Sequence, residues 1–202
     1  MCGIVSYIGH QDPVPILIKG LRRLEYRGYD SAGLALLDGK NLSSIKKAGK
    51  VSDLSDKVSS KSIQGNCGIA HTRWATHGVP NDTNAHPHLD KTGKIALVHN
   101  GIIENYNSIK KTLEGRGVVF KSETDSEVLV QLISELYYKG EGDLDFKDAV
   151  KAALQEVVGA YGIVAMCSDE PSTLVAARMG SPLVFGVGDD EFLFASDASP
   201  II

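Results

Sequence analysis

The second residue, Cys2, carries a thiol directly behind the initiator methionine. Removal of Met1 would give Cys2 a free α-amine as well, so that one residue would hold both a nucleophile and a base. The thiolate is the reactive form of cysteine, and an α-amine with a pKa of about 7.7–8.0 is half-deprotonated near neutral pH. The amine could therefore take the thiol proton through a water molecule. The alternative is an ordinary small residue that opens a strand.

A dense group of polar residues follows the strand predicted at residues 68–72. Residues 71–78 contain an arginine, the single tryptophan of the chain, two histidines and two threonines. Loops at the ends of rigid strands are common places for binding sites. The planar guanidinium of Arg73 matches both oxygens of a carboxylate, so it could bind a substrate carboxylate. The alternative for Arg73 is a surface salt bridge.

Two further groups suggest parts of a site. Asn100 and Gly101 end another predicted strand, where a side-chain amide and a backbone N–H could face a developing oxyanion. An Asn-Gly pair is also common in tight turns, and that alternative stays open. Asp125 lies in the first turn of a predicted helix, where the helix dipole stabilises a carboxylate with or without a ligand amine nearby.

Length and composition predict one domain of moderate charge. The 202 residues are 43% hydrophobic, with 21 basic and 25 acidic residues, so they can form one sizeable core. This charge balance indicates neither nucleic acid nor a membrane surface as a partner. No signal-peptide pattern and no run of about 18 apolar residues occurs, so a cytoplasmic location is expected. Cys67 and Cys167 fit no disulfide framework and are expected to be buried and inert.

The hydrophobic pattern predicts strands and helices in mixed order. Strands are expected at residues 5–8, 34–37, 42–46, 68–72, 94–100, 161–167, 173–178, 183–187 and 191–195, and helices at 16–25, 106–114, 128–138 and 146–158. An Asp-Gly turn predicts a hairpin between the second and third strands, and a capping box at residues 124–127 precedes the third helix. Strands joined by short turns pair antiparallel, so the pattern predicts an α+β domain with helices on antiparallel sheets.

Five stretches together resemble the glutaminase domain of glutamine:fructose-6-phosphate amidotransferases, the glucosamine-6-phosphate synthases. They are residues 1–5, 22–33, 68–78, 99–103 and 122–125, and they occur in order over nearly the whole chain. This family belongs to the class II glutamine amidotransferases within the N-terminal-nucleophile hydrolases. The resemblance implies a four-layer αββα sandwich of two mostly antiparallel sheets, in agreement with the pattern of predicted elements.

The resemblance also implies a reaction. Cys2, freed of Met1, would attack the side-chain amide of L-glutamine to give a γ-glutamyl thioester and ammonia, and water would then release glutamate. Asn100 and Gly101 would form the oxyanion hole. In the full-length enzyme the ammonia would serve the synthesis of glucosamine 6-phosphate from fructose 6-phosphate.

Binding roles follow from the same resemblance. Arg73 would hold the α-carboxylate of glutamine and Asp125 its α-ammonium group. Thr76 and His77 would line the pocket, and Arg27 and Gly28 would support the nucleophile. Trp74 would gate an ammonia channel. No cofactor and no metal is expected, because the implied mechanism needs none. His86, His88 and His99 match no standard metal-ligand spacing and are expected to be structural.

The chain departs from the family pattern in two places. Val79 stands where the family commonly has glutamate, a change at the rim of the implied pocket. In the family, two sugar-phosphate isomerase domains follow a longer glutaminase domain. Residues 1–202 are therefore expected to be a C-terminally incomplete glutaminase domain, which could leave an unpaired strand edge. Fructose 6-phosphate would bind only through the missing domains, and the full-length enzyme is expected to be a homo-oligomer.

Other functions stay in competition. The glutaminase portions of amidophosphoribosyltransferase and asparagine synthetase share the Cys-Gly-Ile start and an Asn-Gly oxyanion element. Residues 73–77 and 25–30 favour the hexosamine enzyme instead. A catalytically silent regulatory module would have the same glutamine pocket but would keep Met1, which would convert the α-amine of Cys2 into an amide.

Overall fold

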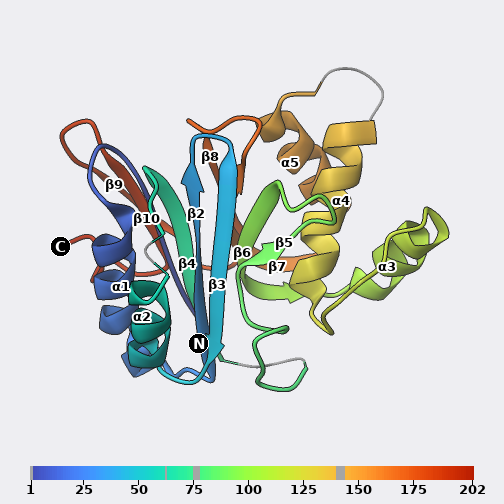
Figure 1. Ribbon diagram of the computed structural model, residues 1–202. Helices are drawn as coiled ribbons and strands as arrows, with labels where there is room; N and C mark the ends of the chain where they lie inside the picture. The colour runs from blue at the N-terminus through green and yellow to red at the C-terminus, as the bar shows by residue number, and fades with distance from the viewer. Residues whose placement is uncertain (1, 62, 75–77, 140–143) are drawn as a thin grey trace.

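The computed structural model describes residues 2–61, 63–74, 78–139 and 144–202, and within these ranges two antiparallel sheets pack face to face (Figure 1). The first sheet has the order β3-β2-β4-β1-β10-β9, formed by β1 (Gly3–Ile8), β2 (Ser31–Asp38), β3 (Asn41–Ala48), β4 (Cys67–Arg73), β9 (Val184–Val187) and β10 (Phe192–Ala195). The second sheet has the order β5-β6-β7-β8, formed by β5 (His88–Leu89), β6 (Ile95–Ile103), β7 (Gly159–Cys167) and β8 (Leu174–Met179).

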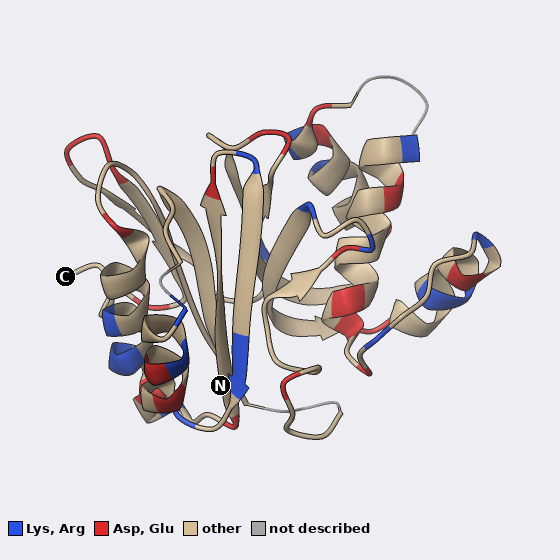
Figure 2. Ribbon diagram, in the orientation of Figure 1, with Lys and Arg blue, Asp and Glu red and all other residues tan. Residues whose placement is uncertain are grey.

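Helices cover the outer face of each sheet. On the first sheet lie α1 (Pro13–Leu24) and α2 (Val51–Ser59), and on the second lie α4 (Asp125–Lys139) and α5 (Phe146–Gln155), while α3 (Tyr106–Gly115) packs against α4 and projects away from the sheet. Charged side chains are concentrated on these helices and on the connections, while the sheet interiors carry few (Figure 2). No helix in the described ranges is both long enough and apolar enough to cross a membrane.

Three clusters of buried apolar side chains separate the layers. One joins α1 and α2 to the first sheet and includes Leu17 and Leu34. The second fills the space between the sheets, where Ile69 of β4 and Val164 of β7 are fully buried. The third joins the second sheet to α4 and α5 and includes Phe146. The layers therefore follow the order αββα, which confirms the predicted sandwich.

Local sequence explains where α1 begins and where the following turn ends. Asp12 Oδ1 accepts a hydrogen bond from the Val14 N–H at 3.0 Å, and a proline at the first helical position needs no such acceptor. The helix therefore begins at Pro13, before the apolar repeat that predicted it. A short 3₁₀ helix (Glu25–Arg27) follows and ends at Gly28, whose φ of 92° favours glycine.

Strand β6 is longer than the sequence predicted. The expected strand ended at Asn100, but β6 continues to Ile103 because residues 101–103 pair with residues 159–161 of β7. The Asn-Gly pair thus lies within a strand, and its interpretation as a tight turn is wrong. Gly101 has a φ of 136°, and a Cβ there would lie 2.0 Å from the Ala160 carbonyl oxygen, so only glycine fits.

Two other elements differ from the prediction. Residues 51–59 form α2, to which the hydrophobic pattern assigned nothing, because only three residues of this short polar segment are buried. The last four predicted strands exist and pair antiparallel, but they are divided between the sheets, with β7 and β8 in the second and β9 and β10 in the first. Within the described ranges β9 is an edge strand of the first sheet, and Phe185 and Val187 on it are exposed.

The capping box before α4 forms only in part. Thr124 Oγ1 accepts a hydrogen bond from the Glu127 N–H at 3.3 Å, as the box requires. The Glu127 carboxylate, however, accepts the N–H groups of Lys121 and Ser122 rather than that of Thr124. The approaching loop offers these two unpaired donors, so the carboxylate caps the loop instead of the helix end.

Burial predicts which apolar side chains stabilise the sandwich. Phe146 is fully buried at the start of α5, whereas Val187 is 68% exposed on β9. Phe146→Ala should lower the free energy of unfolding by about 3–5 kcal/mol because it leaves a cavity. Val187→Thr should change it by less than about 0.5 kcal/mol. Urea denaturation of both variants measures this, and equal losses would contradict the assignment of the third core.

Candidate active site

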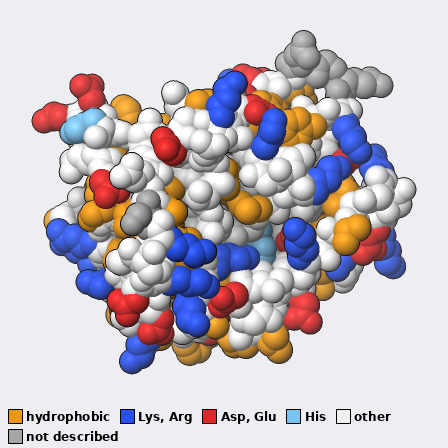
Figure 3. Space-filling view, viewed as in Figure 1, with side chains coloured by type: hydrophobic (Ala, Val, Ile, Leu, Met, Phe, Trp, Pro, Cys, Tyr) orange, Lys and Arg blue, Asp and Glu red, His pale blue; other side chains and the backbone are white. Residues whose placement is uncertain are grey.

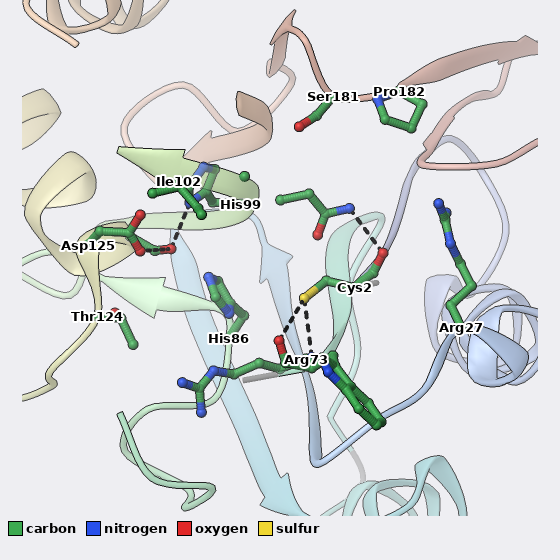
Figure 4. Close-up of a pocket in the computed structure, with 14 residues that line it drawn as sticks. Cys2, Arg27, Arg73, His86, His99, Ile102, Thr124, Asp125, Ser181 and Pro182 are labelled. Atoms are coloured by element: carbon green, nitrogen blue, oxygen red, sulfur yellow. Dashed lines mark hydrogen bonds between the residues drawn. The ribbon is translucent and has the colours of Figure 1, made fainter. Parts of the chain in front are cut away.

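Three strand segments meet at one edge of the sandwich. The start of β1 lies beside the end of β4, because Gly3 pairs with Thr72, and β6 of the second sheet packs against both strands. A cavity of about 470 Å³ opens here (Figure 4). It brings together most of the residues that the sequence predicted to form a site, namely Cys2, Arg27, Arg73, Trp74, Asn100, Gly101 and Asp125.

Cys2 lies immediately before β1, with its sulfur against the backbone at the end of β4. Its Sγ accepts a hydrogen bond from the Trp74 N–H at 3.1 Å, and the thiol lies within 3.5 Å of the Trp74 carbonyl oxygen. Burial raises the pKa of the Cys2 thiol, while the Trp74 N–H and the positive charge of Arg73 lower it. The N–H donor and the guanidinium favour the thiolate once a base has removed the proton.

Asn100 reaches the same place from β6. Its Nδ2 donates a hydrogen bond to the Cys2 carbonyl oxygen at 3.2 Å, and its Oδ1 is 2.9 Å from His71 Nε2. Gly101 is the next residue and lines the same cavity. A side-chain amide and a glycine backbone next to a thiol make up the donor set that an oxyanion hole needs.

Arg73 and Asp125, two of the charged groups that line the cavity, have opposite sign and come from different elements. Arg73, at the end of β4, is 4% exposed and donates from Nη2 to the Gly78 carbonyl oxygen at 3.2 Å. Its Nη1 is 3.8 Å from Asp30 Oδ1, and the Asp30 side chain is partly buried. Because the Arg73 side chain itself is buried, the alternative of a salt bridge at the surface does not describe it. Asp125, at the start of α4, is 8% exposed, and its Oδ2 accepts the Ile103 N–H at 2.8 Å. Figure 4 shows the two groups on different sides of the cavity.

Arg27 connects to the strand that follows the thiol. Its Nη1 donates to the carbonyl oxygen of Ser196 at 3.2 Å and to Ser196 Oγ at 3.1 Å. Ser196 in turn exchanges hydrogen bonds with Ile4 of β1, each at 3.0 Å. Sequence reasoning did not identify Ser196 as a residue of the site. The one feature of the sequence that could have found it is its position directly after the last predicted strand.

Gly28 and Trp74 lie against each other at the rim. A Cβ on Gly28 would lie 2.3 Å from Trp74 Cε3, so the absence of a side chain makes room for the indole. Trp74 is 54% exposed beside the cavity. Thr76 and His77, which the sequence also predicted to line the pocket, lie outside the described residues.

Comparison with known proteins decides the family. A family model of the glutamine amidotransferase domain matches residues 71–202. The chain belongs to this family. It is 57% identical over 203 residues to the glutamine–fructose-6-phosphate aminotransferase (isomerizing) of Bacteroides thetaiotaomicron and 56% identical over 205 residues to that of Chlorobaculum tepidum. Each alignment covers this whole chain but 33% of the relative, so the chain spans about a third of the curated relatives that it matches.

Solved structures support the same fold. Glutamine phosphoribosylpyrophosphate amidotransferase from B. subtilis superposes with a TM-score of 0.83 at 29% identity, covering 98% of this chain and 42% of that one. A structure described as the allosteric regulatory enzyme of purine biosynthesis gives 0.85 at 30% identity, with the same coverage. These likenesses confirm the predicted N-terminal-nucleophile hydrolase type of α+β fold.

The amidotransferase pocket includes residues that sequence reasoning did not assign to it. Ser181 and Pro182 lie in the connection between β8 and β9, far from the other pocket residues in sequence. Figure 4 shows them across the cavity from Arg73. In the sequence, Ser181 and Pro182 indicate only a turn that follows Gly180, and the φ of Gly180 is 79°. Tertiary packing alone brings this connection over the cavity.

Four buried histidines lie beside the pocket, namely His71, His86, His88 and His99. Burial lowers the pKa of each, and that of His71 to about 3. They are therefore neutral at neutral pH. His88 Nε2 is 2.9 Å from Thr124 Oγ1, and His99 Nδ1 is 2.8 Å from Ser126 Oγ. These contacts hold the start of α4, and with it Asp125, against β5 and β6.

A second cleft, of about 830 Å³, lies near the first. Four lysines line it, namely Lys46, Lys57, Lys91 and Lys121, and Figure 3 shows basic side chains gathered beside hollows on this face. Burial lowers the pKa of Lys46 to about 8. None of the described residues that line this cleft is a cysteine. The thiol of Cys2, which lines the first cavity, therefore marks that cavity as the candidate active site.

The neutral histidines predict a loss of stability in acid. Their folded-state pKa values lie below the unfolded value of about 6.5, so the unfolded chain binds more protons as the pH falls. The contribution of these histidines to the free energy of unfolding is fully present above about pH 6.5. As the pH decreases from there, the free energy of unfolding should decrease by about 1.4 kcal/mol per pH unit for each histidine that stays neutral. Urea denaturation between pH 7.5 and 5 measures this.

A matched pair of variants tests the cause of this acid sensitivity. His86→Leu should remove about 1.4 kcal/mol per pH unit from the slope, since His86 is buried without a hydrogen-bond partner for either ring nitrogen among the described residues. His10→Gln should leave the slope unchanged, because His10 is exposed in the folded chain. Equal slopes for wild type and His86→Leu would contradict the explanation.

Proposed function

We propose that this chain hydrolyses the side-chain amide of L-glutamine with Cys2 as the nucleophile. The α-amine that Cys2 gains when Met1 is removed takes the thiol proton, and the thiolate adds to the amide carbon. The C–N bond then breaks, and the protonated amine gives its proton to the departing ammonia. Water attacks the resulting γ-glutamyl thioester and releases glutamate, which restores the thiol.

Stabilisation of the oxyanion falls to Asn100 and Gly101. Charge develops on the amide oxygen when sulfur adds, and donors that are already in place stabilise this charge without reorganisation. The Asn100 amide is held within hydrogen-bonding distance of the Cys2 main chain, which supports this role. Gly101 offers its backbone, and β7 leaves no space there for a side chain.

The charges of the pocket suit the two ends of the amino acid. We assign the α-carboxylate of glutamine to Arg73 and its α-ammonium group to Asp125, because both side chains are buried and line one cavity. Arg27 supports the nucleophile through Ser196 and β1. Trp74, which packs on Gly28, is assigned as the gate between this site and an ammonia channel. Thr76 and His77 are assigned as residues that line the pocket.

The fate of the ammonia follows from the relatives. Aminotransferases named for glutamine and fructose 6-phosphate are 47–57% identical to the whole chain, whereas the glutamine phosphoribosylpyrophosphate amidotransferase of B. subtilis is 29% identical. We therefore assign the ammonia to amination of fructose 6-phosphate by a longer, homo-oligomeric enzyme of which this chain forms about a third. The observation that carries the proposal is the convergence of Cys2, Arg73, Asn100 and Asp125 on one cavity.

Selective labelling tests the nucleophile. A diazo-ketone analogue of glutamine should modify Cys2 and spare Cys67 and Cys167, because only Cys2 lines the cavity and would carry an α-amine as a base on its own residue. Burial raises the pKa of Cys67 to about 12 and raises that of Cys167, and neither thiol has such a base. Glutamine should slow the labelling. Mass spectrometry of the intact and digested protein measures the modified residue and shows whether Met1 is gone. Full labelling of Cys2→Ala would refute the assignment, and protein that keeps Met1 and releases no glutamate would favour a silent binding module.

Steady-state kinetics separates binding from chemistry. Asn100→Ala should lower kcat about 100- to 1000-fold with little change in KM, since an oxyanion donor acts in the transition state. Asp125→Asn and Arg73→Ala should mainly raise the KM for glutamine, because each removes one charge that binds the amino acid. Glutamate release over a range of glutamine concentrations measures both constants. An Asn100→Ala enzyme with unchanged kcat would rule out the oxyanion role.

A further inference from the structure

The side-chain amide of Asn100 can serve as an oxyanion donor only if a neighbouring group holds it in one of its two orientations. The two ends of a side-chain amide have nearly the same shape, yet only the nitrogen end can donate a hydrogen bond to an oxyanion. In the structure Nδ2 points to the Cys2 carbonyl oxygen at 3.2 Å, and Oδ1 lies 2.9 Å from His71 Nε2. A flipped amide would present a carbonyl oxygen to the developing negative charge and would repel it.

His71 supplies the contact that decides between these two orientations. Its Nε2 lies 2.9 Å from Asn100 Oδ1 and 3.1 Å from the carbonyl oxygen of His99. A main-chain carbonyl can only accept a hydrogen bond, so Nε2 must carry the proton. The same N–H then requires an acceptor on Asn100, and only Oδ1 is one. The protonated Nε2 therefore excludes the flipped amide.

The rest of the His71 environment supports this tautomer. The side chain is fully buried, and Nδ1 has no hydrogen-bond partner among the described residues, so Nδ1 is the nitrogen without a proton. Burial lowers the pKa of the ring to about 3, which keeps it neutral under working conditions. The ring packs on His86, with 4.1 Å between ring centroids. His71 itself lies in β4, where it pairs with Ile4 and Gly33, so its backbone is held on both sides.

We infer that His71 is a positioning residue for glutamine hydrolysis, whose neutral Nε2–H holds the Asn100 amide with its nitrogen turned toward the oxyanion. This inference rests on the proposed function. His71 touches neither the substrate nor the sulfur in this arrangement, and it acts through Asn100 alone. Its loss should consequently affect kcat rather than glutamine binding, and only while Asn100 is present.

A double-mutant cycle tests this dependence. His71→Leu removes the donor at similar volume and should lower kcat about 10- to 100-fold, less than the loss of Asn100 itself, with KM changed less than about threefold. In the Asn100→Ala background the same substitution should cost less than about twofold, because there is no amide left to orient. Equal fold-losses in both backgrounds would overturn the inference.

His71→Gln is the matched conservative variant. Its amide NH₂ can reach about the position of Nε2 and donate to both oxygens, so it should recover most of the kcat that His71→Leu loses. Urea denaturation verifies that all variants are folded. A folded His71→Gln protein as slow as His71→Leu would also overturn the inference, because a merely structural ring would be the simpler explanation.

A direct measurement separates this inference from the proposed function. Nitrogen-15 NMR of the His71 ring should show the Nε2–H tautomer at pH 7 and no protonation down to pH 5, in protein with or without activity. The opposite tautomer, or a charged ring, would refute the orientation of Asn100 even in an active enzyme. A processed wild-type chain that releases no glutamate would refute the proposed function while leaving this ring assignment intact.

Discussion

The antiparallel pairing of β1 between β4 and β10 is the constraint on which the candidate site depends. Cys2 directly precedes this central strand, so the ladder that sets Gly3 opposite Thr72 also sets the sulfur against Trp74. A slip of one residue would turn every side chain of β1 to the opposite face and carry the thiol away from Asn100. Both neighbours of β1 hold this register, and Ser196 after β10 adds hydrogen bonds to Ile4.

Hydrogen-bonded polar groups between the two sheets fix how the elements are arranged at the edge of the sandwich that carries the candidate site. Burial of an ionised histidine would be costly, and the fold avoids that cost by keeping its four buried histidines neutral. Two of them contact hydroxyl groups at the start of α4, and His71 contacts Asn100. The network thereby connects α4, β4 and β6, the elements that carry Asp125, Arg73 and Asn100. The cost of this arrangement is a loss of stability as the pH falls.

Sequence patterns predicted most of the regular structure for identifiable reasons. The helix at Pro13–Leu24 has a side-chain cap and a regular apolar stripe, and the hairpin of β2 and β3 has an Asp-Gly turn, so both are local signals. Prediction failed where the deciding contact was distant. Gly101 reads as part of a turn until β7 lies beside it, and α2 has too few apolar residues to be distinguished from a loop. The last four strands read as one antiparallel series although β8 and β9 belong to different sheets.

By itself, the sequence determined the chemistry that is available: a cysteine at the second position, an arginine and an aspartate for an amino acid, and an Asn-Gly pair for an oxyanion. Residue types and short motifs carry that information because reactivity and charge belong to side chains. Only the tertiary structure decided that these groups face one cavity together with Ser181, and that Ser196 and His71 contact Arg27 and Asn100 beside it. Their positions depend on sheet register and on packing between residues up to 192 positions apart, and no local pattern records such contacts.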